Sequence, residues 1–165
     1  MEGASHRLIL LFLAAVLLSG CEKWGSLTEA KEIYGKHKAE LMELFATINP
    51  HKEFRYLSSL SDPDSKHFVE QYGPFNQDSK EAYKRSIKIM EIIGVQSVLI
   101  SRFKSQAGYE TEITKFLVFG RGFGGNTEGI WIVHYSGVED ILDFFYPNGV
   151  CENLDQRHWY ACQSS

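Results

Sequence analysis

The sequence predicts an α+β fold, with two main helices packed on one face of an antiparallel β-sheet meander. Apolar residues recur at steps of three and four in the first half of the chain, which is the helical period. The second half contains runs rich in β-branched and aromatic residues, separated by glycine-containing segments. Because the helices precede a series of strands and do not alternate with them, an antiparallel sheet is favoured.

The first helix is expected from a capping box at Ser26 and Glu29 to Asn49-Pro50, which ends it. Gly35 is a weak point in this stretch, since glycine costs about 1 kcal/mol relative to alanine inside a helix. The remaining pattern places one continuous apolar stripe along the helix. The stripe consists of Leu27, Ala30, Tyr34, His37, Leu41, Leu44, Phe45 and Ile48.

A second helix is expected after Asp78-Ser-Lys-Glu81, which is similar to a capping box, and Gly94 suits its C-cap. The intervening segment is mixed, with a short strand or turn near Phe54–Leu57 and a brief helix over Lys66–Gln71.

Strands are expected in the second half of the chain, followed by a turn at 147–149. Segment 138–145 fits either a helical turn or a further strand. The expected strands are Val95–Phe103, Glu112–Phe119, Gly129–Tyr135 and Arg157–Cys162.

The N-terminus has the features of a secretory signal peptide. An uncharged apolar run from Leu8 to Leu18 follows a short segment that contains Arg7. This run is shorter than the ~20 residues that a helix needs to cross a bilayer. It therefore predicts export of the chain.

Leu18-Ser19-Gly20-Cys21 resembles the lipobox of bacterial lipoproteins. The resemblance implies a diacylglycerol on the Cys21 thiol, cleavage before Cys21 and acylation of the new amine. Two or more acyl chains anchor a protein stably, at ~0.8 kcal/mol per buried CH₂. The expected organisation is a signal peptide at 1–20, a lipidated tether at 21–25 and one α+β domain at 26–165. Glu22, where the family's inner-membrane signal is commonly Asp, favours the outer membrane and a domain facing the periplasm.

Cys151 and Cys162 remain once Cys21 is assigned to lipid. An exported, oxidising compartment favours a disulfide between them. Closing so short a loop is worth ~3 kcal/mol in the chain-entropy model. A metal pair or a catalytic thiol is less favoured, because the spacing is not C-x-x-C and no second cysteine pair completes a zinc site.

The net charge and the sequence motifs make some classes of function less favoured. Lys plus Arg number 17 against 21 for Asp plus Glu, a net charge of −4, which disfavours nucleic-acid binding. Gly120–Gly125 matches G-x-G-x-x-G, but the following Ile130–Val133 run is typical of a strand, whereas a dinucleotide site requires a helix there. We interpret the segment as a hairpin tip on which Arg121 and Phe123 contact a partner. No cofactor or metal site is predicted.

Phe144-Phe145-Tyr146 cannot all point inward in a strand, because neighbouring residues alternate between faces. Exposed aromatic surface often marks protein contacts, so Phe145 and Tyr146 are further candidate contacts. His134 with Asp140 or Asp143 is a candidate general base with its orienting acid, although no nucleophile motif accompanies it.

These patterns favour a lipid-anchored envelope protein that binds a protein partner without catalysis. In size and charge the chain is similar to periplasmic immunity and inhibitor proteins, which block an exported toxin or hydrolase, although no residue motif carries that likeness. Two alternatives remain open. One is an accessory factor in envelope assembly or maintenance. The other is an envelope hydrolase that uses His134 with Asp140 or Asp143.

Overall fold

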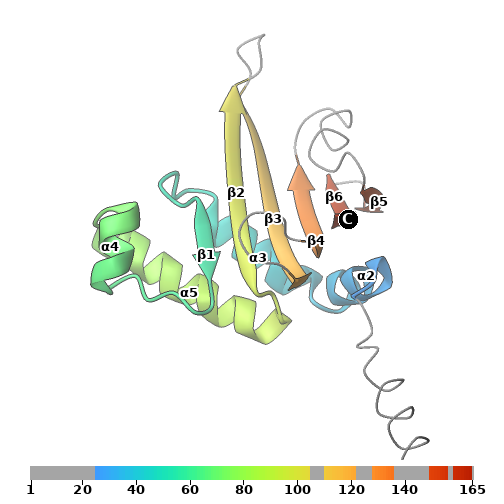
Figure 1. Cartoon of the computed structure of the whole chain (residues 1–165), viewed down its shortest axis with the longest axis horizontal. Coiled ribbons are helices and arrows are strands. Elements are labelled where there is room, and N and C mark those ends of the chain that lie inside the picture. Colours follow the sequence, from blue (N-terminus) through green and yellow to red (C-terminus); the bar gives the residue numbers. More distant parts are fainter. Residues whose placement is uncertain (1–24, 105–109, 122–127, 136–148, 156–157, 165) are drawn as a thin grey trace, which may run out of the picture.

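A computed structural model confirms the α+β fold. It describes residues 25–104, 110–121, 128–135, 149–155 and 158–164. Helices come first along the chain and strands dominate the second half (Figure 1). The helices are α2 (Leu27–Lys36), α3 (Lys38–Ile48), α4 (Lys66–Tyr72) and α5 (Gln77–Ile93). The strands are β1 (Tyr56–Ser58), β2 (Ser97–Lys104), β3 (Glu110–Arg121), β4 (Glu128–Tyr135), β5 (Val150–Asp155) and β6 (Trp159–Ser164).

The predicted long first helix is wrong in one respect, because it is two helices joined at His37. The capping box is present: the Ser26 hydroxyl accepts from the Glu29 amide and the Glu29 carboxylate accepts from the Ser26 amide. His37 leaves helical geometry at φ −120° and ψ 28°. The break turns the two halves toward different partners, since α2 packs on β4 and β6 whereas α3 packs on α5.

The second predicted helix begins two residues earlier than expected. Asn76 is the N-cap of α5, and its side-chain oxygen accepts from the Ser79 amide at 2.8 Å. Ser79 is therefore inside the helix and only 1% exposed. Gly94 ends α5 in the left-handed conformation, with φ 73°, as its role as a C-cap requires.

The six strands form one antiparallel sheet in the order β1-β2-β3-β4-β6-β5. β2, β3 and β4 follow the predicted meander, and β1 is the short strand that the sequence allowed near Phe54–Leu57. The sequence analysis did not predict β5, and it started the last strand two residues early. β6 pairs with β4, and β5 pairs with β6 at the edge of the sheet, with Cys151 directly opposite Cys162.

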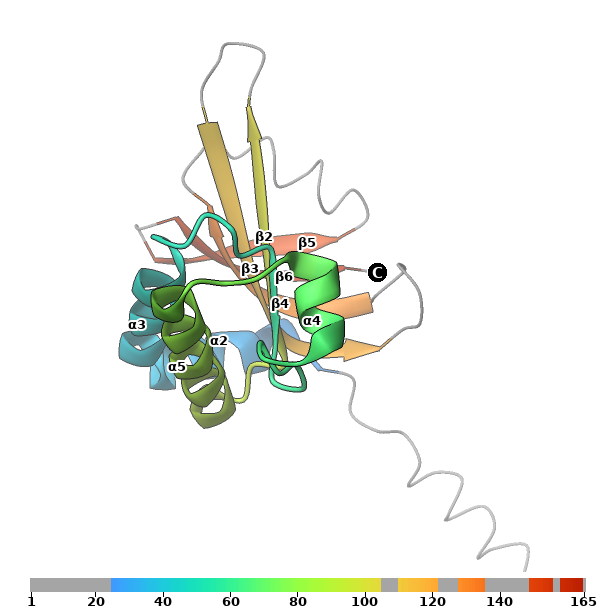
Figure 2. The ribbon, with the colours of Figure 1, turned by 90° about the vertical axis from the view of Figure 1, so that its left-hand side faces the viewer.

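The two faces of the sheet carry different groups of buried side chains. The larger group joins the sheet to α2, α3 and α5, which lie on one face (Figure 2). Its largest members include Trp159, Tyr83, Phe54 and Phe116. The opposite face carries a smaller group, which consists of Ile113, Val133, Tyr135, Tyr160 and Cys162.

The glycines at the β3–β4 connection allow close packing. A β-bulge shifts the register between Leu117 and Phe119. An added Cβ at Gly129 would lie 2.9 Å from Trp131 Nε1, and one at Gly120 would lie 3.0 Å from Leu117 Cδ2. The glycine-rich segment thus connects two strands, and at Gly120 and Gly129 an added side chain would require neighbouring side chains to shift.

Candidate functional site

The structure places only some of the residues that the sequence singled out. Cys151 and Cys162 are bonded, with an S–S distance of 2.07 Å, which confirms the predicted disulfide. Arg121 is the last residue of β3. Cys21, Phe123, Phe145, Tyr146, Asp140 and Asp143 lie outside the described residues, as does segment 138–145, so the predictions for them stay predictions.

His134 lies between two aromatic rings on the helix-covered face of the sheet. Its ring centroid is 4.1 Å from that of Phe45 and 4.9 Å from that of Trp159. Burial, with a smaller contribution from His158, lowers the pKa of His134 below its ordinary value. Nothing in this packing favours a role in hydrolysis over a role in the core.

A groove of about 510 Å³ lies between α3 and α5, and no sequence motif indicated it. Its lining residues are Glu43, Ala46 and Thr47 from α3, His51 from the following loop, and Asp78, Glu81, Ala82 and Arg85 from α5. The alanines and the threonine leave space between the helices, and the charged side chains surround it.

Two carboxylates in the groove form no ion pair with a described residue. Glu43 does pair with Arg85, at 2.6 Å. Glu81 accepts only a hydrogen bond from Gln77, at 2.9 Å, and Asp78 is exposed. The groove is therefore acidic even after its one arginine is counted.

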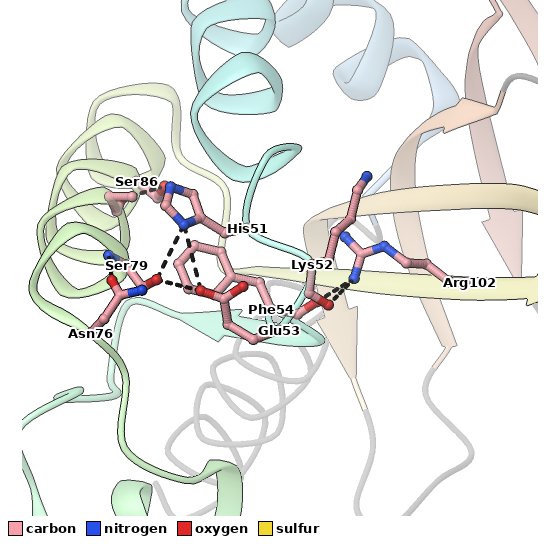
Figure 3. Close-up of polar contacts among 9 residues, drawn as sticks. His51, Lys52, Glu53, Phe54, Asn76, Ser79, Ser86 and Arg102 are labelled. Atoms are coloured by element: carbon pink, nitrogen blue, oxygen red, sulfur yellow. Dashed lines mark hydrogen bonds and ion pairs between the residues drawn. The ribbon is translucent and has the colours of Figure 1, made fainter.

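Figure 3 shows His51, which lines the groove, joined to Glu53 and Ser79 in a hydrogen-bonded triangle. The buried Ser79 hydroxyl donates its proton to Glu53 Oε1. His51 Nδ1 lies 3.3 Å from Ser79 Oγ and 3.5 Å from Glu53 Oε1. Both oxygens act as acceptors toward Nδ1, so when the imidazole is neutral we assign its one ring proton to Nδ1, and Nε2 then has a lone pair to accept with.

The charge on Glu53 is maintained by these contacts. Partial burial on its own would raise the pKa of Glu53. Hydrogen bonds from Ser79 and from the backbone, together with the nearby His51, outweigh that effect and hold the pKa below its ordinary value. Glu53 is thus the anionic member of the triangle.

The triangle does not have the geometry of a serine hydrolase. In a Ser-His-acid triad the hydroxyl and the acid lie on opposite ring nitrogens. Here both lie on Nδ1, and Ser79 is 1% exposed, so a substrate could not reach its oxygen. The arrangement fixes the position of the imidazole, which also stacks on Phe54 at 4.9 Å between ring centroids.

Arg102 of β2 holds the loop that carries His51. Its Nη1 donates to the carbonyl oxygens of Lys52, at 2.8 Å, and Phe54, at 2.9 Å, and its Nε donates to Glu112 at 2.5 Å. The sheet therefore determines where the loop lies relative to α5 (Figure 3).

A group of exposed apolar side chains lies on and beside β1 and β2, at one edge of the sheet. Tyr56 of β1 and Leu99 of β2 are direct cross-strand neighbours, 37% and 36% exposed, and Leu60 just beyond β1 is 95% exposed. The exposed aromatic surface that the sequence analysis expected at Phe145 and Tyr146 lies outside the described residues and stays a prediction. Apolar surface of this kind is common at protein contacts.

Within the described ranges, no cluster of histidine, cysteine and acidic residues has the geometry to hold a metal ion. None of the helices in those ranges is both long enough and apolar enough to span a bilayer. Compared with protein-family models, with curated proteins and with solved structures, the chain matches none of them.

Proposed function

We propose that the chain is an envelope protein, anchored by lipid at Cys21, that binds a protein partner without catalysing a reaction. The observation that carries the proposal is the acidic groove between α3 and α5. Asp78 and Glu81 offer carboxylates that pair with no cation in the described part of the chain, beside an imidazole held in place by Glu53 and Ser79.

The chemistry of the groove favours a basic partner. A lysine or arginine side chain entering the groove would meet the carboxylates of Asp78 and Glu81, and His51 Nε2 could accept one of its N–H groups. Complementary charge speeds association and disfavours acidic competitors. A basic exported toxin or hydrolase, blocked by an acidic inhibitor, fits these requirements.

The exposed Tyr56, Leu99 and Leu60 supply a second contact surface of different chemistry. Polar contacts alone give specificity more readily than affinity, and buried aromatic side chains dominate the energy of most interfaces. We expect the complex to bury at least one of these two surfaces.

The test is a capture experiment on the mature domain with two matched variants. The groove variant combines Asp78→Asn with Glu81→Gln. The control combines Glu32→Gln with Glu91→Gln, which changes the net charge equally at exposed positions outside the groove. Circular dichroism and thermal melting confirm that both are folded.

We expect wild type and control to capture the same basic protein from an exported fraction, with binding that weakens as salt is raised. The groove variant should lose most of that binding. Equal capture by the groove variant and the control would refute the groove as the contact.

A further inference from the structure

The chain enters the described fold at one particular end of the sheet. Gly25 lies against Phe119: an added Cβ would be 2.9 Å from three carbon atoms of the Phe119 side chain. Phe119 is near the end of β3, and α2 begins two residues after Gly25. The start of the domain is thus packed in place and does not hang free.

Strand register shows which other residues share this end. Gly120 pairs with Gly129 at the start of β4, and Gly129 pairs with Ser164 at the end of β6. Ser97, at the start of β2, pairs with Leu117. We call these residues with Gly25 and Phe119 the anchor end.

The groove belongs to the opposite end of the sheet. Arg102, five residues along β2 from Ser97, bonds the loop that carries His51. At about 3.4 Å per residue, this places the Arg102 contact ~17 Å along the strand from the anchor end. In Figure 1, β2 runs upward from the level at which β3 ends, and α2 lies beside that lower end.

We propose that the anchor end faces the bilayer and that the groove faces away from it. The inference rests on the proposed lipid at Cys21. Gly25 is only four positions after Cys21, and a fully extended chain spans at most ~3.6 Å per residue. The Cα atom of Gly25 therefore lies within ~14 Å of the Cα atom of Cys21, whatever the tilt of the domain.

The chemistry of the anchor end suits a lipid surface. Phe119 and Trp131 are partly buried there, and Trp131 Nε1 approaches the Gly129 backbone. Aromatic side chains with one polar group are favoured at the boundary between lipid and water.

Depth measurements on the acylated full-length chain test the orientation. Gln96→Cys places a thiol beside Ser97 at the anchor end, and Lys52→Cys places one beside His51 at the groove end. Both positions are exposed. Cys151 and Cys162 are bonded to each other and Cys21 carries the lipid, so a fluorescent label reacts at the introduced thiol.

Energy transfer is measured to acceptors on the headgroups of phosphatidylethanolamine–phosphatidylglycerol vesicles. We expect transfer from position 96 to exceed that from position 52, because the Arg102 contact that holds the loop carrying Lys52 lies ~17 Å along the strand from Ser97. A flexible Gly/Ser linker of about 20 residues inserted before Gly25, with a mean reach of about 25 Å, should bring the ratio toward one.

Flotation of the vesicles distinguishes a failure of the proposed lipid anchor from a failure of the proposed orientation. A protein that floats with lipid but gives equal transfer at the two positions, or more at position 52, overturns the orientation and leaves the anchor standing. A wild-type chain that stays out of the lipid fraction, as Cys21→Ser should, overturns the anchor and the orientation together.

Discussion

The disulfide between Cys151 and Cys162 should be a major contribution to the stability of the domain. The bond joins directly opposed residues of β5 and β6, at a sequence separation of 11. Replacing both cysteines with alanine releases that loop in the unfolded chain. The chain-entropy relation gives a loss of about 2.8 kcal/mol at 25 °C for a loop of this length.

Packing adds a smaller loss, because Cys162 is fully buried beside Val133 and Tyr160. Removing its sulfur costs about as much as removing a methylene, ~0.8 kcal/mol. The expected total is ~3.5 kcal/mol. For a domain of this size it corresponds to a fall in Tm of roughly 10 °C.

Urea and thermal unfolding of the mature domain measure this difference. The Cys151→Ala/Cys162→Ala protein is compared with wild type, each with and without a thiol reductant. Wild type should lose stability in reductant, and the double variant should not respond to it. A loss below ~1 kcal/mol, or a wild type whose Tm is unchanged by full reduction, would refute the reasoning.

Three further substitutions test the fold and the site. Gly129→Ala should destabilise the domain, because the added Cβ would meet the Trp131 side chain and the backbone. Gly35→Ala should stabilise α2 by up to about 1 kcal/mol, because no atom lies within 4 Å of the added Cβ. Equal shifts in the melting temperatures of the two variants would contradict this. Folding lowers the pKa of Glu53, so this carboxylate stabilises the folded protein at pH values above its ordinary pKa of 4.5. That stabilisation is lost as the pH falls through the lower pKa of the folded state. Glu53→Gln should remove this part of the acid-side slope in urea titrations, and an unchanged slope would contradict the assignment.

The fold class was predictable because apolar residues recur with the helical or the strand period over long stretches of the sequence. In the strands that the sequence predicted, alternate residues are buried on the same face of the sheet, as Val98 and Ile100 of β2 are. β5 escaped prediction because it is an edge strand in which no residue is buried and polar residues interrupt any apolar run, Val150–Asp155. Its pairing with β6 and the disulfide hold it in the sheet, and neither has a local signature.

The boundary errors also have physical causes. Asp78 opens a plausible capping box, yet Asn76 has the same capping chemistry two residues earlier and brings Ser79 into the helix. The break at His37 lies two residues after Gly35, the weak point of the apolar pattern. Packing on two different partners, α5 and the β4–β6 pair, determines where the helix divides.

The groove could not be predicted from the sequence, for a different reason. Asp78, Glu81 and Arg85 recur at helical spacing on α5, which by itself describes an ordinary solvated face. Their significance depends on α3 lying opposite them. His51 and Ser79 are 28 residues apart, so no short motif could join them.

The position of the groove follows from the sheet through a chain of specific contacts. Glu112 on β3 neutralises Arg102, and the Arg102 guanidinium binds the carbonyl oxygens of Lys52 and Phe54. The loop so held presents His51 and Glu53 to Ser79 at the start of α5. A charge pair on two strands thereby fixes an imidazole between two helices, at the end of the sheet opposite to the one where the chain enters.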